Sequence, residues 1–111
     1  MLPQIPNGTV LAWTPIQFQF DGYGATTTQT FVLTNLGALK SKPISLSLSP
    51  GDPTYSLIND NCTGVKLLPS NSCTVDVQFT MPNNIVPVQS LDATDGVTSA
   101  PTASIKNCNA C

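Results

Sequence analysis

Hydrophobic and polar positions alternate along several short stretches of the chain, most regularly over residues 72–80. The apolar positions there are Cys73, Val75, Val77 and Phe79, and the polar positions between them are Thr74, Asp76, Gln78 and Thr80. Successive side chains of a β-strand point to opposite faces of the sheet. This period of two therefore predicts a strand with one buried face and one solvated face.

Weaker alternation of the same kind predicts further strands. The expected ranges are 16–20, 28–34, 43–49, 55–58, 65–68 and 102–106, separated by turns rich in glycine, proline and asparagine. Prolines at positions 82, 87 and 101 interrupt the pattern, so residues 83–101 are predicted to form a long loop with room for a short edge strand. No stretch has a helical period with caps. The fold class is therefore predicted to be all-β, a sandwich of about seven antiparallel strands.

The domain organisation follows from the same pattern. Residues 1–14 are predicted to be an extended N-terminal arm, residues 15–106 the domain, and residues 107–111 a cysteine-containing tail. Val10, Leu11 and Trp13 are the apolar residues of the arm, and an arm of this kind could add a strand to a neighbouring copy. The first residues do not resemble a signal peptide, and no apolar run approaches the roughly 20 residues of a membrane span, so membrane insertion is not expected.

The charged residues are few and narrow the possible functions. The chain has 111 residues with four lysines, six aspartates and no arginine, glutamate or histidine. Without histidine there is no Ser/His/Asp or Cys/His nucleophile, and four dispersed lysines form no nucleic-acid or membrane-binding patch. The dispersed aspartates lack the spacing of a calcium loop. The sequence therefore predicts that the protein is not an enzyme and uses no cofactor or metal.

The four cysteines permit three disulfide pairings. A short turn separates Cys62 from the strand that begins at Cys73, which favours a Cys62–Cys73 disulfide and an oxidising compartment, although the spacing decides only in part. Cys108 and Cys111 form a C-x-x-C at the chain end without a predicted helix, so a structural or intermolecular disulfide is expected there. A redox role for this pair is the alternative. A zinc site is disfavoured, because ten residues separate Cys62 from Cys73.

Several of these segments together resemble a known family. The segments are Asn35-Leu36-Gly37 after the 31–34 strand, Tyr55-Ser56-Leu57-Ile58, Asn61-Cys62-Thr63-Gly64, residues 68–75, and Val77-Gln78-Phe79. They resemble the choice-of-anchor D domain, which is similar to the hydin-type (ASH) immunoglobulin-like domains, over residues 16–82. The resemblance implies a seven-stranded immunoglobulin-like sandwich, no enzymatic activity, a Cys62–Cys73 disulfide, and a place in secreted, surface-anchored or virion proteins.

The leading functional hypothesis is an extracellular structural module. It would be a subunit or repeat of a surface filament, appendage or virus particle, secreted or displayed at the cell surface, whose partners are other copies of itself or a larger assembly. The first alternative is a recognition module for adhesion to a glycan or protein through loops at one end of the sandwich, using Trp13, Tyr23 or Tyr55. A core position for Trp13 is the competing interpretation of that residue. The second alternative is a thiol-redox protein.

Overall fold

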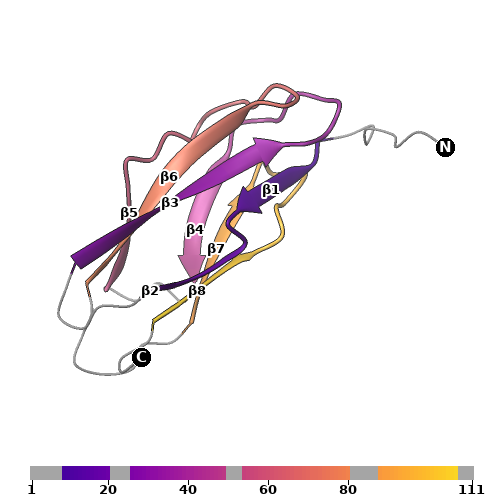
Figure 1. The fold of residues 1–111 in the computed structure, drawn as a ribbon. Helices are drawn as coiled ribbons and strands as arrows, with labels where there is room; N and C mark the ends of the chain where they lie inside the picture. The colour runs from indigo at the N-terminus through magenta and orange to yellow at the C-terminus, as the bar shows by residue number, and fades with distance from the viewer. Residues whose placement is uncertain (1–8, 21–25, 50–53, 81–87, 108–111) are drawn as a thin grey trace.

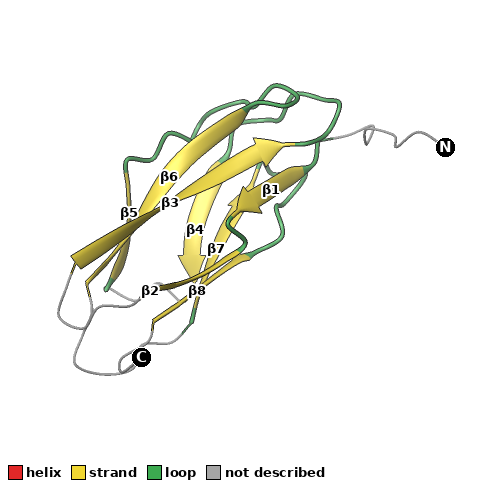
Figure 2. Cartoon of the chain, viewed as in Figure 1, coloured by secondary structure: helices red, strands yellow, loops and turns green. Residues whose placement is uncertain are grey.

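The computed structural model of the chain describes residues 9–20, 26–49, 54–80 and 88–107. Regular secondary structure in these ranges is all β-strand and forms two four-stranded sheets packed face to face (Figures 1 and 2). The all-β sandwich predicted from the sequence is confirmed. Its strands are β1 (Leu11–Thr14), β2 (Gln17–Phe20), β3 (Thr26–Asn35), β4 (Ser45–Ser49), β5 (Tyr55–Ile58), β6 (Ser72–Thr80), β7 (Gln89–Thr94) and β8 (Ala103–Asn107).

The strand order is that of an immunoglobulin-like domain. One sheet has the order β1-β3-β6-β5 and the other β2-β8-β7-β4. These match the A-B-E-D and C-F-G sheets of a constant-type immunoglobulin domain, with β2 added beside β8. The described residues form eight strands because the first strand is divided: β1 pairs with β3 in one sheet, and β2 pairs with β8 in the other. The β2–β8 pair is parallel, so the prediction that all strands are antiparallel is wrong at this edge.

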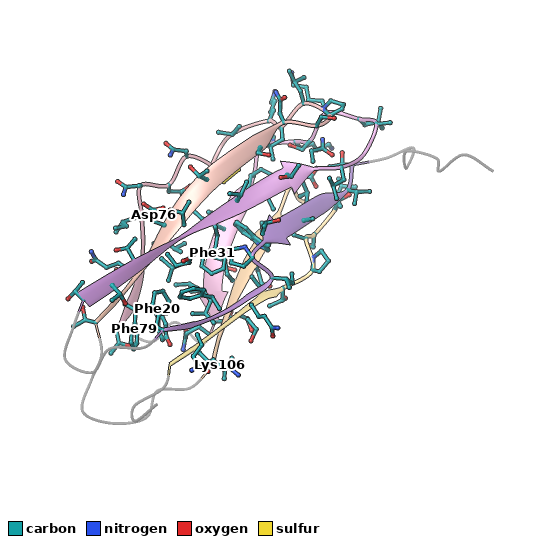
Figure 3. The ribbon with its side chains drawn as sticks, in the orientation of Figure 1. Phe20, Phe31, Asp76, Phe79 and Lys106 are labelled. Atoms are coloured by element: carbon teal, nitrogen blue, oxygen red, sulfur yellow. A yellow bond between two sulfur atoms is a disulfide. The ribbon has the colours of Figure 1, made fainter. Side chains whose placement is uncertain are left out.

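The core lies between the sheets and is built from alternate residues of the central strands. Val75, Val77 and Phe79 of β6 have no exposed surface, as the sequence pattern predicted. The β6 strand pairs with β3 over nine residues, in a register that places Phe31 opposite Val75. Phe20 of β2 stacks on Phe79 from the other sheet with ring centroids 5.2 Å apart, and Figure 3 shows both rings between the sheets. The aromatic side chains of the two sheets thus form one apolar layer between them.

The predicted N-terminal arm overlaps the sandwich. Its residues Leu11–Thr14 form β1, in which Leu11 and Trp13 are only 1% and 4% exposed. The ring of Trp13 packs edge-on against Phe31 at 6.2 Å. These two side chains are therefore part of the protein's own core and are unavailable for insertion into a neighbour. Residues 1–8 of the predicted arm and the tail from residue 108 lie outside the described residues.

Two strand predictions are corrected. Residues 65–68 form no strand; they belong to the loop between β5 and β6, where Leu67 is buried while Val65 and Leu68 are exposed. Residues 89–94, predicted to lie in a long loop, form β7, which sits between β8 and β4 in the middle of its sheet. The inward positions of β7 are Gln89, Leu91 and Ala93, a pattern too weakly apolar to predict a central strand.

The β5–β6 loop is held by the disulfide that the sequence favoured. Cys62 and Cys73 are bonded, with their Cα atoms 5.1 Å apart. Beyond Cys62 the chain turns at Gly64, whose φ of 81° suits glycine, and Val65 N donates to the carbonyl of Cys62. This turn contacts the start of β4 in the opposite sheet, where Gly64 N donates to Ile44 O at 2.8 Å. The disulfide thus fixes a loop that joins the two sheets.

Candidate functional site at the loop end

Three loops meet at one end of the sandwich. They are residues 36–44 between β3 and β4, the second part of the β5–β6 loop, and residues 95–102 between β7 and β8 (Figure 1). Thr9 and Val10, which precede β1, lie at the same end, because Val10 O accepts a hydrogen bond from Leu36 N at 2.7 Å. We call this end of the molecule the loop end. In immunoglobulin-like domains, loops grouped at one end commonly carry the binding residues.

Asn35 is the polar centre of the loop end. Its side chain is fully buried, and its Nδ2 donates to the carbonyl oxygens of Leu39 at 2.7 Å and Leu67 at 3.0 Å. Its Oδ1 accepts from Gly37 N at 2.9 Å and from Val10 N at 3.4 Å. One side chain therefore joins three separate segments of chain. Buried amides are expensive unless their hydrogen bonds are satisfied, and here both donors and the acceptor are used.

Ser41 makes a second connection between two of these loops. Its hydroxyl accepts from Leu67 N at 2.7 Å and donates to Lys42 O at 2.9 Å. Its backbone N donates to Leu67 O at 2.8 Å. Ser41 is 3% exposed, so these bonds are shielded from competing water. They fix the 36–44 loop on the β5–β6 loop.

Asp95 organises the third loop. Its carboxylate accepts hydrogen bonds from the backbone N–H groups of Thr98 at 2.7 Å, Val97 at 2.9 Å and Lys42 at 3.1 Å. Burial alone would raise the pKa of this carboxyl group, but the hydrogen bonds from Thr98, Val97 and Lys42 outweigh burial and lower the pKa from its usual value of 3.8. Asp95 is 8% exposed and its oxygens are occupied by the protein's own backbone. Its role is to hold the loop, which leaves it poorly suited to bind a ligand.

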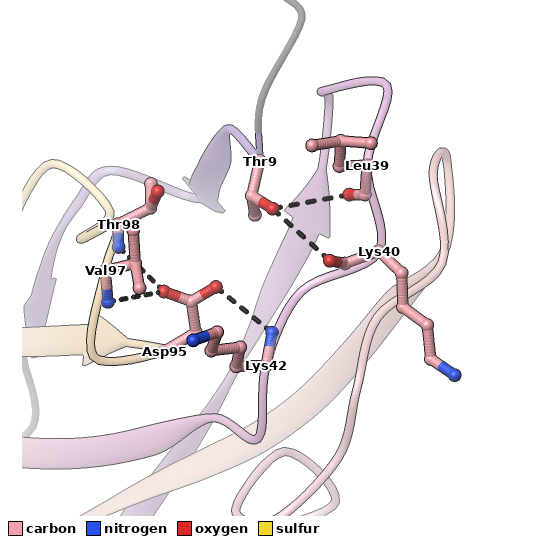
Figure 4. Close-up of a pocket in the computed structure, with 7 residues that line it drawn as sticks. All are labelled: Thr9, Leu39, Lys40, Lys42, Asp95, Val97 and Thr98. Atoms are coloured by element: carbon pink, nitrogen blue, oxygen red, sulfur yellow. Dashed lines mark hydrogen bonds between the residues drawn. The ribbon is translucent and has the colours of Figure 1, made fainter.

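A hollow of about 280 Å³ opens between these loops (Figure 4). Thr9 closes one side, with its hydroxyl 3.4 Å from Leu39 O and 3.5 Å from Lys40 O. Figure 4 shows Asp95 in the hollow and the side chain of Lys40 extending away from it. The residues that line it are Thr9, Leu39, Lys40, Lys42, Asp95, Val97 and Thr98.

Exposed apolar side chains are frequent around this hollow. Leu39 is 56% exposed and Val97 74% exposed, and both line it. Leu36, on the same loop as Leu39, and Leu68, on the β5–β6 loop, are 54% and 49% exposed. Lys40, Lys42 and Lys66 are exposed on the same loops. We call these seven residues the loop-end surface: Leu36, Leu39, Lys40, Lys42, Lys66, Leu68 and Val97.

A second hollow, of about 250 Å³, lies on the outer side of the β2–β8 pair. It is lined by Gln17, Phe18, Gln19 and Lys106, and Figure 3 shows Lys106 at the surface. It has one charged group and no pair of groups that could act together as acid and base. It therefore supports no chemistry of its own.

The aromatic residues proposed for binding are not part of the loop-end surface. Trp13 and Tyr55 are 4% and 5% exposed, and the Tyr55 ring packs against Phe79 at 4.6 Å. Their ring faces are therefore closed to a ligand at the surface, which contradicts the suggested binding role. Tyr23, Cys108 and Cys111 lie outside the described residues, so the predictions for them stay predictions. No cluster of cysteine and aspartate that could hold a metal is found among the residues that the structure describes.

The sequence does not predict the residues that build the loop end. Its local pattern indicates turns at Asn35 and Asp95 and gives no role to Ser41. Asn35 and Asp95 each stand two residues before a backbone N–H that they bind, a spacing typical of Asx turns. That signal indicates a turn, but it does not show that the same side chain also reaches segments distant in sequence.

Comparisons with known proteins support the fold. No protein-family model and no curated protein sequence matches the chain. Among solved structures, the VesB protease of Vibrio cholerae is similar at 21% identity and a TM-score of 0.64, over 89% of this chain and 31% of that one. The secreted serine protease VesC of Vibrio cholerae is similar at 16% identity and a TM-score of 0.58, over 82% of this chain and 21% of that one. A CARDB domain from Pyrococcus furiosus aligns at 10% identity and a TM-score of 0.48, over 96% of this chain and 95% of that one.

These similarities correct one prediction. The chain spans less than a third of the length of each protease it resembles, and those proteins are enzymes. A sandwich of this kind thus occurs within enzymes. This contradicts the prediction that the protein is not an enzyme, which rested on this fold and on the residues of these 111 positions alone.

The described residues also bear on the compartment. The Cys62–Cys73 disulfide indicates a non-cytosolic environment, because thiols are kept reduced in the cytosol. The described residues include no helix that is long and apolar enough to span a membrane.

Proposed function

We propose that the protein is an extracellular structural module that assembles with other copies of itself through its loop-end surface. The observation that carries the proposal is the grouping of exposed leucine and valine side chains on three loops that are tied together from beneath. Exposed apolar side chains grouped at one end of a small domain are a common mark of a protein–protein contact. The three lysines around it would add selectivity for a partner surface that carries carboxylates.

The hydrogen bonds beneath the surface support this role. Asn35, Ser41 and Asp95 fix the three loops through buried bonds to backbone groups. A surface that is already ordered loses little conformational entropy when a partner binds. The exposed Leu39 and Val97 are thus presented on a rigid base.

The path of the chain suits a serial arrangement of modules. Thr9 lies at the loop end, whereas β8 runs from that end to Asn107 at the opposite end of the sandwich (Figure 1). A contact between the loop end of one copy and a different surface of the next would be heterologous, and such contacts build open chains. This geometry favours a repeat or filament subunit, as in secreted, cell-surface or virion assemblies. The likeness of residues 16–82 to the choice-of-anchor D domain supports the same setting.

A second candidate is a domain within a larger secreted enzyme, and the similarity to parts of VesB and VesC favours it. A Ser/His/Asp triad needs a histidine, and these 111 residues contain none, so such a triad would need residues from elsewhere in the protein. Sequencing the coding region on both sides tests this candidate. A neighbouring domain with a histidine, an aspartate and a serine in triad geometry would support it, and a reading frame limited to sandwich domains would contradict it.

The test of the assembly proposal is the particle mass in solution. Sedimentation equilibrium of the oxidised protein should give masses above the monomer that rise with concentration. The double variant Leu39→Asp, Val97→Asp should lower the association constant by at least about tenfold, since it places two charges in an apolar contact. Ile16→Asp is the matched control, because Ile16 is 46% exposed and lies outside the loop end. Equal weakening by the control and the double variant would contradict a contact through the loop end.

A further inference from the structure

The outer edge of β4 presents backbone groups that have no partner among the described residues. Among the described strands, β4 is the last of its sheet, and β7 is its one partner. Its neighbour Ile44 directs both N–H and C=O away from β7, since Ile44 N donates to Val65 O at 3.0 Å and Ile44 O accepts from Gly64 N. Peptide groups alternate in direction along a strand. Leu46 and Leu48 therefore direct theirs outward as well, while the serines between them bond to β7.

The β4 edge lacks the usual protection of an edge strand. Natural edges are commonly blocked by lysine, proline or a bulge. β4 reads Ser-Leu-Ser-Leu-Ser, with no charge and no proline, and its five residues pair with β7 in unbroken register. The serine side chains are small and exposed, and Leu46 and Leu48 are half-buried against the core. β4 itself thus presents an approaching strand with neither a charge nor a large exposed side chain.

The sequence of β4, Ser-Leu-Ser-Leu-Ser, reads the same in both directions. This favours the β4 strand of a second copy as the partner of the open edge. If two copies pair antiparallel about a two-fold axis at Ser47, then Leu46 of each copy lies opposite Leu48 of the other. All outward N–H and C=O groups of both leucines would then be bonded. Centring the pair on Leu46 would place Leu48 opposite Ile44, whose groups are already used. Centring it on Leu48 would place Leu46 opposite Pro50, which has no N–H.

We propose that two copies of this chain join through antiparallel pairing of their β4 strands, centred on Ser47. The pairing makes one continuous eight-stranded sheet from two four-stranded ones. The two-fold axis is perpendicular to the sheet, so the leucines of both copies lie on the same face and the serines on the other. The turn at Gly64 occupies the position beside Ile44 and ends the pairing there. This dimer goes beyond the proposed function, because the β4 edge and the loop-end surface are separate contacts.

The geometry provides a charge test at one residue. Residues on the axis form a non-hydrogen-bonded pair, in which the Cα atoms are about 4.5 Å apart and the side chains are close. Ser47→Lys would place two ammonium groups opposite each other, and like charges directly opposite destabilise a strand pair. The side chain of Ser47 is exposed, so the substitution leaves the fold of the monomer unchanged.

The experiment measures dimerisation by sedimentation velocity in the Leu39→Asp, Val97→Asp background, which removes the loop-end contact. Ser47→Lys and Ser47→Asp should each weaken the dimer by about fivefold or more. An equimolar mixture of the two should form a heterodimer more tightly than either variant self-associates. Ser56→Lys is the control, because Ser56 is exposed on β5, an edge strand of the opposite sheet. Circular dichroism and thermal melting confirm that each variant is folded.

Three results would overturn the dimer. One is a protein with Ser47 intact that stays monomeric up to about 1 mM, where even a weak pair would form. In that case the partner of the β4 edge would be an extended segment of another protein. The second is equal weakening by Ser47→Lys and Ser56→Lys. The third is a lysine–aspartate mixture that pairs no better than its components. If Leu39→Asp, Val97→Asp leaves association unchanged while Ser47→Lys weakens it, the proposed function is contradicted and the β4 dimer is supported.

Discussion

The outer edge of β4 has a covered part and an open part, only two residues apart. At Ile44 both backbone groups are bonded by the turn that follows Cys62, whereas at Leu46 and Leu48 they meet no described residue. The side-chain pattern is the same in both parts, since Ile44, Leu46 and Leu48 all face the core. The difference is made by a loop fixed elsewhere in the molecule. The disulfide-held turn therefore decides how far the edge is covered, because it bonds Ile44 and makes no bond to Leu46 or Leu48.

The largest effect is expected from a substitution that destabilises the whole sandwich, because the covered and the open part of the edge are then lost together. Val77→Asp would bury an unpaired carboxylate in the core of β6, where Val77 has no exposed surface, and should lower the free energy of unfolding by about 4 kcal/mol. Gln78→Asp, on the other face of the same strand, should change it by less than about 0.5 kcal/mol. Chemical denaturation measures both. Similar losses in the two variants would contradict the register of β6.

Removing the disulfide should affect the covered part of the edge and leave the open part unchanged. The bonded cysteines are 11 residues apart in sequence. A disulfide that closes a loop of that size stabilises the folded protein by about 3 kcal/mol, because it lowers the entropy of the unfolded chain. The double variant Cys62→Ala, Cys73→Ala should lose about that amount in denaturant melts and should free the turn from Ile44. Because Leu46 and Leu48 make no bond to the turn, their exposure should stay as it is. A variant as stable as the parent would show that the loop is held by its other contacts.

The smallest effect concerns Asp60, which shapes the covering turn. Its carboxylate accepts from Cys62 N at 2.8 Å, from Thr63 N at 2.9 Å and from the Thr63 hydroxyl. Burial would raise the pKa of Asp60, but the bonds from Thr63 and Cys62 lower it below its usual 3.8. The stabilisation is therefore complete above about pH 4 and is lost as the pH falls through the lowered pKa.

Asp60→Asn should cost about 1 kcal/mol near neutral pH and should make stability less dependent on pH below about 4. Thr63→Ala is the comparison, because it keeps the carboxylate and its bonds from Cys62 N and Thr63 N but removes the hydroxyl bond that lowers the pKa most, so it should lose only part of the acid dependence. Denaturant melts from pH 2.5 to 7 would show the difference. If the stability of Asp60→Asn depends on acid pH as strongly as that of the parent, the Asp60 carboxylate does not stabilise the turn.

The sequence predicts the fold better than the surfaces, for physical reasons visible in particular residues. The β6 strand and the Cys62–Cys73 disulfide were predicted because alternation and cysteine spacing are local signals. The sequence does not predict β7, because its inward side chains are Gln89, Leu91 and Ala93, and only the middle one is strongly apolar. It does not predict β1, because four residues are too few to show a period.

The loop end and the β4 edge depend on contacts between distant segments. Asn35 reaches Leu67, 32 residues away, and Gly64 reaches Ile44, so no local pattern reports them. The open edge could have been suspected from the uncharged Ser45–Ser49 alternation, but its position at the end of a sheet could not. Sequence shows which side chains a strand buries, and the tertiary structure decides which backbone groups stay unpaired.

The most direct test of the two-part edge is amide hydrogen exchange, measured by NMR on the Leu39→Asp, Val97→Asp, Ser47→Lys variant at a concentration where sedimentation shows it to be monomeric. The Ile44 amide should exchange slowly, because its bond to Val65 O must open first, while the Leu46 and Leu48 amides should exchange at rates close to those of unfolded peptides. Reducing the disulfide should speed exchange at Ile44 and leave the two leucines unchanged. Leucine amides as slow as that of Ile44 in this monomer would contradict an open β4 edge.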